Sequence, residues 1–177
     1  MREEKDVRIF FALWPDEKVR RNIVDLFADS DLDPARGRFL SPGNIHMTLH
    51  FIGNSSLAEM KCLQRQASGV AGDSFVVDLD RQGYFSKPKV LWIGCSHTPR
   101  ALPDLQARLG QQLLRCDFTP ERRPFNPHVT IARKLAVAPK HIKFEAIRWK
   151  IDRFVLVESR PIPEGVQYQV IDEYPLN

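Results

Sequence analysis

The pattern Asn-x-His-apolar-Thr-apolar occurs twice in this chain, once in each half, and no other feature constrains the fold as strongly. The first copy is residues 44–49 and the second is residues 126–131. Large apolar and β-branched residues surround both copies, which predicts two buried strands. Because residues i and i+2 point to the same face of a strand, the histidine and threonine of each copy should lie side by side. We therefore expect two similar strands that each present a His-Thr pair.

The elements predicted around these two strands mix β and α. Apolar spacing, capping residues and breakers place strands at residues 7–14, 44–52, 74–79, 90–95, 126–133, 147–158 and 166–174, and helices at residues 15–30, 57–70 and 99–116, with a loop at 31–38. The repeated motif suggests an internal duplication. We predict one domain over residues 1–177 with a bilobal α+β fold. In it, two antiparallel or mixed sheets, flanked by helices, face a central cleft, and the two histidine strands meet at a pseudo-two-fold axis.

Composition bounds the class of protein. The 177 residues carry a formal net charge of +4, which is compatible with a nucleic-acid or phosphate partner without indicating one. The three cysteines are odd in number and lack C-x-x-C spacing, so we expect reduced thiols in a cytoplasmic protein, without disulfide or zinc. No apolar segment approaches ~18 residues and no signal-peptide core follows the charged start, so we expect no membrane association.

The residue types in the repeated motif suit acid–base chemistry on a phosphodiester. An imidazole titrates near pH ~6.5, so one of His46 and His128 can act as general base while the other acts as general acid. The hydroxyls of Thr48 and Thr130 can donate hydrogen bonds to phosphate oxygens. Arg133, at the end of the second strand, can bind phosphate with a fixed charge. This arrangement needs neither a metal nor another cofactor.

Two structural alternatives compete with this interpretation. A histidine in a strand is most often structural, although two copies in matching settings weaken that explanation for the pair. His46 and His50 have the spacing of helical zinc ligands, but on a strand four residues span roughly 13 Å, which is too far to bind one ion. We therefore expect His50 to lie on an exposed face or to support the site from outside.

A different class of function is also open. Residues 81–89 mix cations with Tyr84 and Phe85, which could stack on the bases of single-stranded RNA. The chain would then be an RNA-binding module without catalysis. A pure binding module would not need the pair of histidines, which is the feature that separates the two hypotheses.

These motifs resemble those of the 2H phosphoesterase superfamily, which is named for its two His-x-Thr motifs. More narrowly, the chain is similar to the bacterial and archaeal RNA 2′,3′-cyclic phosphodiesterases, also called the 2′-5′ RNA ligase family. The similarity extends over nearly the whole chain and includes residues 8–12, 44–53, 90–94, 127–133 and 158–168. It implies a two-lobed α+β fold with the histidines in a central cleft.

The resemblance also implies roles for single residues. A cyclic phosphate at an RNA 3′ end would be opened to a 2′-phosphomonoester without a metal. We also expect a monomer, and a small cyclic nucleotide stays open as an alternative substrate. His128 would activate water and His46 would protonate the departing 3′ oxygen, with Thr48, Thr130 and Arg133 on the phosphate. Reversal of the same steps would join RNA ends through a 2′-5′ bond without ATP, and the sequence does not separate the two reactions.

Two aromatic residues are candidates for a contact with the nucleoside. Phe11 matches a family aromatic near the nucleoside, although it reads equally well as a residue of the strand core. Phe51 is a similar candidate, but strict strand alternation places it on the face opposite His46, so we rank it lower.

Overall fold

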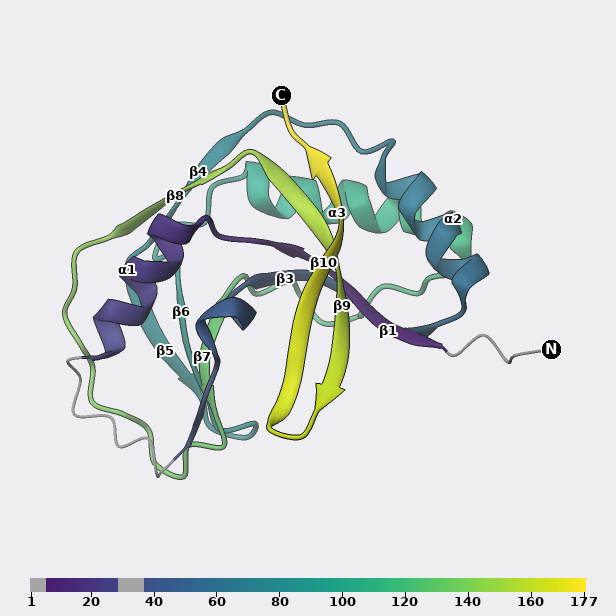
Figure 1. The fold of residues 1–177 in the computed structure, drawn as a ribbon. Coiled ribbons are helices and arrows are strands. Elements are labelled where there is room, and N and C mark those ends of the chain that lie inside the picture. Colours follow the sequence, from purple (N-terminus) through teal and green to yellow (C-terminus); the bar gives the residue numbers. More distant parts are fainter. Residues whose placement is uncertain (1–5, 29–36) are drawn as a thin grey trace.

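The computed structural model describes residues 6–28 and 37–177 and has an α+β fold (Figure 1). The strands in these residues are β1 (Val7–Leu13), β2 (Arg38–Phe39), β3 (Met47–Ser55), β4 (Phe75–Leu79), β5 (Arg81–Phe85), β6 (Val90–Gly94), β7 (Val129–Arg133), β8 (Ile147–Ile151), β9 (Arg153–Ile162) and β10 (Gly165–Pro175). The helices are α1 (Glu17–Ala28), α2 (Leu57–Ala67) and α3 (Ala101–Leu113), with 3-10 turns η2 (Pro42–Asn44) and η3 (Leu114–Cys116).

Most strands belong to one antiparallel sheet, and the two histidine motifs lie at its middle. The order is β10-β9-β1-β3-β7-β6-β5, with β2 paired to β7, while β4 and β8 form a second, two-stranded sheet. Strands β3 and β7 meet through the backbone register pair of Met47 and Val129. The predicted α+β class, the antiparallel sheets and the adjacency of the two histidine strands are confirmed, and the larger sheet runs through both halves.

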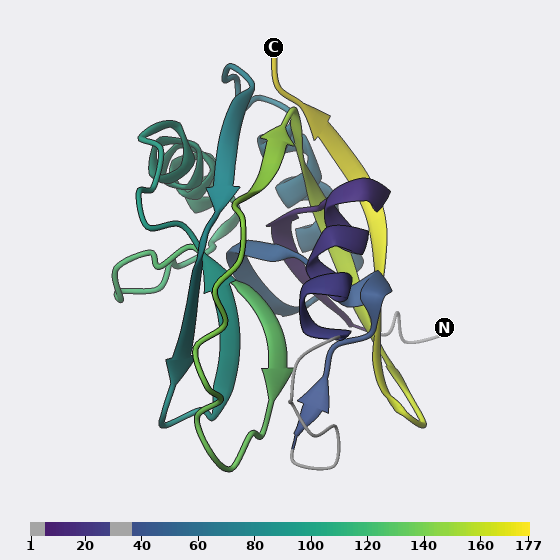
Figure 2. The same cartoon turned by 90° about the vertical axis from the view of Figure 1, so that its left-hand side faces the viewer.

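The three α helices cover the sheets with their apolar stripes. Figure 1 shows α2 and α3 close together at one end of the molecule and α1 on the other side, and in Figure 2, seen from that side, α1 stands in front of α2. Ile23 of α1, Leu63 of α2 and Leu105 of α3 all enter one hydrophobic core. Their spacing within each helix is what predicted these elements, because a helix must bury one apolar stripe.

Strand β1 is apolar on both faces, and the two faces have different surroundings. Ile9 and Phe11 are fully buried in the main core. Phe10 and Ala12 point the other way and form a small second cluster with residues of β9. The face that carries Phe10 is the one on which the histidine motifs lie, as described below.

Two predicted segments differ from the structure. The long strand at 147–158 is two strands, β8 and β9, because the chain leaves β4 as partner of β8 and joins β1 after Asp152. No strand was predicted between residues 79 and 90, but β5 pairs with β6 along Arg81–Phe85. Gly83 permits this pairing, because a Cβ there would overlap the indole of Trp92.

The remaining boundaries agree within a few residues. Helix α1 begins after Asp16, whose carboxylate accepts the Val19 N–H at 2.8 Å. Its predicted end near residue 30 and most of the predicted loop 31–38 lie outside the described residues.

Within the described ranges, none of the helices combines the length and the apolar composition needed to cross a lipid bilayer.

The expectation that all cysteines are reduced is wrong. Cys62 of α2 and Cys116 of η3 form a disulfide, with 5.8 Å between their Cα atoms, and Cys95 is the free thiol. Spacing along the chain did not reveal the pair, because it is the packing of α2 on α3 and η3 that brings two distant residues together. The prediction of a cytoplasmic protein therefore loses the support that reduced thiols gave it.

The disulfide predicts a redox-dependent stability. It closes a loop of 54 residues, so opening it should restore chain entropy to the unfolded state worth about 4 kcal/mol. We expect dithiothreitol to lower the Tm of the wild type by on the order of 10 °C. Cys62→Ser should show the low Tm with or without reductant, and the matched variant Cys95→Ser should behave as wild type. An unchanged wild-type Tm in reductant would contradict the bridge.

Candidate active site

The four residues of the two His-x-Thr motifs lie on one face of the main sheet. Met47 stands opposite Val129 where β3 meets β7, and both side chains are fully buried. In an antiparallel pair the flanking residues point to the other face. The register therefore sets His46 beside Thr130 and Thr48 beside His128, so that each histidine neighbours the threonine of the other motif.

His46 is held on three sides. Its Nδ1–H donates to the carbonyl of Asn44 at 2.7 Å, and its Nε2 lies 3.0 Å from the hydroxyl of Thr48. The rings of Phe10 and Tyr168 enclose it, with ring centroids 4.9 and 5.2 Å away. Because the backbone carbonyl can only accept, the neutral ring carries its proton on Nδ1 and turns an unprotonated Nε2 toward the hydroxyl.

His128 repeats this anchoring in the second motif. Its Nδ1–H donates to the carbonyl of Asn126 at 2.7 Å, again two residues upstream. Phe85 lies edge-on at 5.1 Å between ring centroids, and Trp92 lies at 6.2 Å. His128 is only half buried, whereas His46 is 7% exposed. Its Nε2 is therefore free to accept a proton from a small molecule in the cleft.

Both imidazoles are pushed toward their neutral form. Burial lowers the pKa of His46 to about 4, with further lowering by the charges of Arg133 and His128, against the opposing hydrogen bond to Asn44. Burial also lowers the pKa of His128, and Arg133 adds to the effect while the Asn126 carbonyl opposes it. A site with these charges favours an anion, because an anion between the rings would offset the repulsion.

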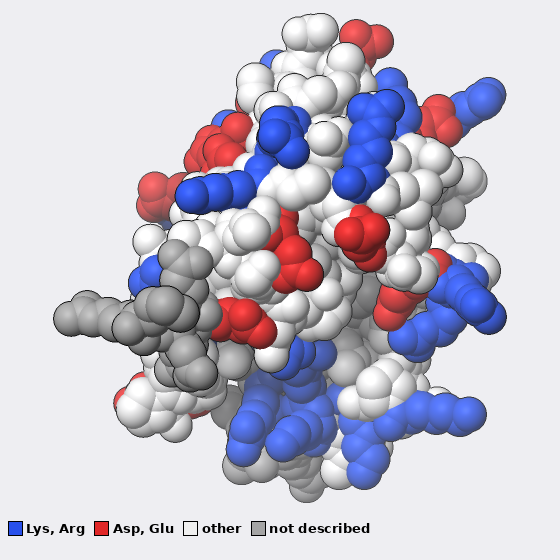
Figure 3. Space-filling view, turned by 90° about the vertical axis from the view of Figure 1, so that its right-hand side faces the viewer, with Lys and Arg blue, Asp and Glu red and all other residues white. Residues whose placement is uncertain are grey.

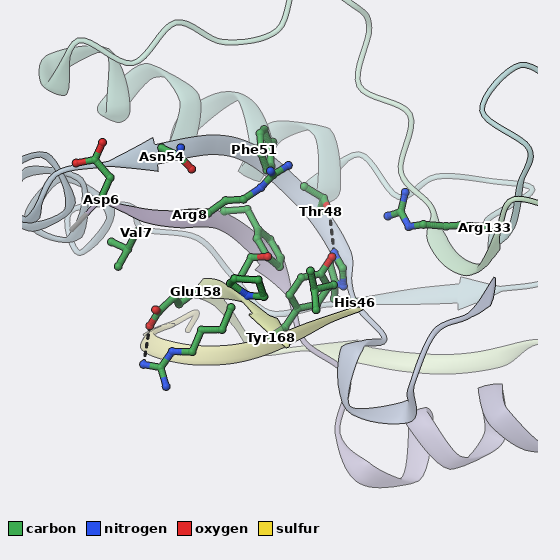
Figure 4. Close-up of a pocket in the computed structure, with 15 residues that line it drawn as sticks. Asp6, Val7, Arg8, His46, Thr48, Phe51, Asn54, Arg133, Glu158 and Tyr168 are labelled. Atoms are coloured by element: carbon green, nitrogen blue, oxygen red, sulfur yellow. Dashed lines mark hydrogen bonds and ion pairs between the residues drawn. The ribbon is translucent and has the colours of Figure 1, made fainter. Parts of the chain in front are cut away.

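A cavity of about 960 Å³ opens beside His46 and Thr48, between β1 and β3 on one side and the β9–β10 hairpin on the other (Figure 4). Arg133 of β7 reaches toward it from the opposite direction. The volume is in the range of small-molecule sites and exceeds what a phosphate group alone would fill. His46, Thr48 and Arg133 line this cavity directly. Thr130 is 6% exposed, and neither it nor His128 belongs to the cavity wall.

Of the two interpretations of Phe11, the structure agrees with the strand core and not with a position near the nucleoside. Phe11 is fully buried and packs against Phe154 and Tyr174 in the main core. The aromatic of β1 that lines the cavity and contacts His46 is Phe10. Adjacent residues of a strand face opposite ways, and both faces of β1 are apolar, so the sequence pattern did not show which face met the site.

Strand β3 does not keep strict alternation, which changes two more expectations. Ala12 pairs with Thr48 and Phe11 pairs with His50, so β3 carries one extra residue, Leu49, as a bulge. Phe51 therefore returns to the cleft face, where it is 47% exposed and lines the cavity. The expectation that Phe51 lies on the face opposite His46 is therefore wrong.

His50 is turned to the opposite face by the same bulge. It is 6% exposed and hydrogen-bonds through Nε2 to the Gln106 carbonyl of α3 at 2.7 Å. It lies on neither an exposed face nor the cleft. Burial lowers its pKa, against the effect of that hydrogen bond. His50 thus anchors β3 to helix α3.

Sequence reasoning missed the role of the Asn44 side chain. Asn44 is 7% exposed; its Nδ2 donates to the Val166 carbonyl at 2.7 Å, and its Oδ1 accepts the Tyr168 N–H at 3.0 Å. These two bonds fix β10 beside His46. The signal was present in the sequence, because Asn stands two residues before the histidine in both motifs, but its partner lies more than a hundred residues away.

The aromatic residues proposed for a binding module are engaged within the protein. Tyr84 donates its hydroxyl to the Leu135 carbonyl at 2.6 Å. Phe85 packs between Trp92 and His128. These contacts give both rings a structural part in the second half of the site.

A family model described as the 2′-5′ RNA ligase superfamily matches residues 17–161. The chain belongs to this superfamily.

Among its relatives, the RNA 2′,3′-cyclic phosphodiesterase of Escherichia coli (strain K12) is 32% identical over 131 residues, which is 74% of each chain. The protein of that name from Thermotoga maritima is 30% identical over 182 residues and 94% of each chain. Among solved structures, E. coli LigT complexed with 3′-AMP has a TM-score of 0.90 at 27% identity and covers 98% of this chain and 99% of its own. A crystal structure described as a phosphoesterase has a TM-score of 0.91, also at 27% identity, with the same coverage.

Asn44 should contribute more to the stability of the protein than Asn126, its counterpart in the second motif. Asn44→Ala removes two partly buried hydrogen bonds to β10, at a cost of roughly 1–3 kcal/mol. We expect Asn44→Ala to lower the Tm by on the order of 5–10 °C and to impair the site through a displaced Tyr168. The matched variant Asn126→Ala keeps the carbonyl that anchors His128 and should stay close to the wild-type Tm. Equal losses of Tm in the two variants would contradict this asymmetry.

Proposed function

We propose that this protein hydrolyses the 2′,3′-cyclic phosphate at the end of an RNA strand, leaving a 2′-phosphomonoester. The observation that carries the proposal is the mirrored pair of His-Thr motifs on one sheet face, with both Nδ1 atoms anchored by backbone carbonyls. Each anchoring leaves an Nε2 for the chemistry. The relatives named as RNA 2′,3′-cyclic phosphodiesterases support the same reaction.

His128 acts as the base in this proposal. Its greater exposure lets a water molecule approach, and its unprotonated Nε2 takes the proton of that water. The water oxygen attacks phosphorus as the bond to the 3′ oxygen breaks. A positioned base of this kind contributes about 10²–10⁴-fold.

His46 acts as the acid and receives its proton together with the substrate. In the free site its pKa of about 4 keeps it neutral at neutral pH. A bound phosphodiester anion favours the imidazolium, because it offsets the positive charges that lower this pKa. The Nε2–H of the imidazolium then protonates the departing 3′ oxygen, while Nδ1–H stays on the carbonyl of Asn44.

Thr48, Thr130 and Arg133 stabilise the phosphate during attack. Charge builds on the two non-bridging oxygens, and fixed donors aimed at that position stabilise the transition state more than the ground state. We propose a monomer of a single domain, because one chain contains both His-Thr motifs. The substrate class includes a small cyclic nucleotide as well as an RNA end.

Ligation is the second candidate reaction. The acid and base that open a cyclic phosphate with water can join it to a 5′-hydroxyl instead. The exposure of His128 supports this alternative, because a hydroxyl at the end of a second strand can take the place of the water.

Removal of either histidine should abolish the reaction. His46→Ala and His128→Ala should each lower kcat for a 2′,3′-cyclic nucleotide by at least about 10²–10⁴-fold, with an unchanged circular dichroism spectrum. His141→Ala, in an exposed loop, is the matched control and should keep the wild-type rate. A folded His46 or His128 variant near the wild-type rate would show that the roles are misassigned.

The product isomer tests which oxygen leaves. The protein is incubated with RNA ending in a 2′,3′-cyclic phosphate in excess EDTA, and the product ends are separated by chromatography. We expect a 2′-phosphate formed at an undiminished rate. A 3′-phosphate would mean that the ribose lies the other way round between the histidines. Loss of activity in EDTA would contradict the metal-free mechanism.

The pH profile should depend on Arg133. The histidine pair must hold one proton, and both pKa values are lowered in the free site. The alkaline limb of kcat/KM should therefore lie below the ordinary imidazole value of ~6.5. Arg133→Gln removes a charge that lowers both pKa values, so this limb should move to higher pH while the maximum falls by about 10²–10³-fold. Arg133→Lys keeps the charge and should keep the limb; an unmoved limb in Arg133→Gln would refute the electrostatic assignment.

A further inference from the structure

Four exposed cations gather around Arg133 at one rim of the cleft. They are Arg38, Lys87, Lys89 and Lys134, called here the basic rim. Arg38 of β2 is the register partner of Arg133. Lys134 follows Arg133 in the chain, and the Leu135 N–H donates to the Lys89 carbonyl at 3.1 Å, which places the β5–β6 turn beside them. Figure 3 shows Lys and Arg side chains gathered at the lower end of this face, where these segments lie in Figure 1.

The basic rim is unfavourable for the folded protein by itself. Arg38 and Arg133 stand directly opposite each other on neighbouring strands, and like charges in that position repel. In the part of the chain that the structure describes, no carboxylate forms an ion pair with any of the four residues of the rim. Among the described residues, therefore, no ion pair offsets this repulsion.

Backbone strain coincides with this charge. Lys89 has φ of 55° and Lys134 has φ of 58°, in the left-handed region that favours glycine or asparagine. Among the described residues, the one other non-glycine residue with positive φ is Asp117. A lysine at each of two adjoining strained positions serves the fold less well than glycine would, which points to a use for the side chains.

The far end of the cleft has no such excess of positive charge. Asp6 and Glu158 line that end together with Arg8 and Arg160, so the charges there balance. Glu158 and Arg160 are also paired with each other at 2.8 Å. A polyanion that has one end between the histidines is therefore attracted toward Arg133 and the basic rim, and not toward the far end.

We propose that the basic rim binds the phosphate backbone of a single RNA strand whose end lies in the site. This inference rests on the proposed function and adds to it: the substrate is an RNA chain, with phosphates beyond the reacting one held by Arg38, Lys87, Lys89 and Lys134.

The test uses variants that should not weaken the fold. Lys89→Gly and Lys134→Gly remove two charges and place glycine where φ is positive, so the double variant should have a Tm no lower than the wild type. Lys61→Ala with Lys150→Ala is the matched control, because it removes two exposed lysines from α2 and β8, away from the rim. The ligand is a labelled single-stranded RNA of about ten nucleotides with an unreactive 2′-phosphate end.

Binding is followed by fluorescence anisotropy across a range of salt concentrations. Each lost phosphate contact should weaken affinity about fivefold at ~0.1 M salt and reduce the slope of log Kd against log salt by about 0.7. We expect about 25-fold weaker binding for the rim variant and wild-type binding for the control. KM for a cyclic-ended RNA should likewise rise more than KM for a 2′,3′-cyclic mononucleotide.

Several outcomes would overturn the inference. Unchanged RNA affinity in the rim variant would do so, as would an equal loss in the control, which would mean that only net charge matters. Competition by polyglutamate as effective as competition by RNA would indicate an acidic protein partner instead. Because the RNA used for binding is unreactive, these outcomes are separate from failure of the proposed function, which would appear as no hydrolysis of the cyclic mononucleotide by the wild type.

Discussion

One backbone pairing, Met47 opposite Val129, joins the two halves of the main sheet, and the arrangement of the site depends on it. The pairing faces both motifs the same way and sets each histidine beside the threonine of the other motif. Each histidine is then anchored locally by a carbonyl two residues upstream at 2.7 Å. The similar orientation of the two histidines thus comes from short local hydrogen bonds. The single long-range pairing of Met47 with Val129 brings the two motifs together.

The two halves differ in what surrounds these equivalent anchors. His46 is enclosed by Phe10, Tyr168 and the side chain of Asn44, whereas His128 rests on Phe85 and remains half exposed. Burial is the first cause of the lowered pKa in both, and it acts most strongly on His46. A duplicated motif can therefore supply two different catalytic roles, because the environment, and not the motif, distinguishes an acid from a base.

Much of this could be predicted from the sequence, and the failures have physical causes. Spacing of apolar residues gave the helices, and the repeated motif gave the adjacent histidine strands and four polar residues of the site. Phe51 was placed on the wrong face because strict alternation fails at the bulge of Leu49. The choice between the two interpretations of Phe11 stayed open because both faces of β1 are apolar. The disulfide and the bonds of Asn44 to β10 depend on partners 54 and more than a hundred positions away, which local patterns do not report.

The enclosure of His46 by β10 has a consequence for the order in which the protein assembles. The hydrogen bonds of Asn44 join residues 122 and 124 positions apart, so they close only after nearly all of the chain between them has been arranged. Contacts of such separation form late and slow folding, because the entropy of closing long loops must be overcome first. A nascent or partly folded chain can already have the local Nδ1 anchors of both histidines while lacking the environment that differentiates them. The fully formed site is in this sense a marker of the native state, and its appearance during refolding would trail that of the helices.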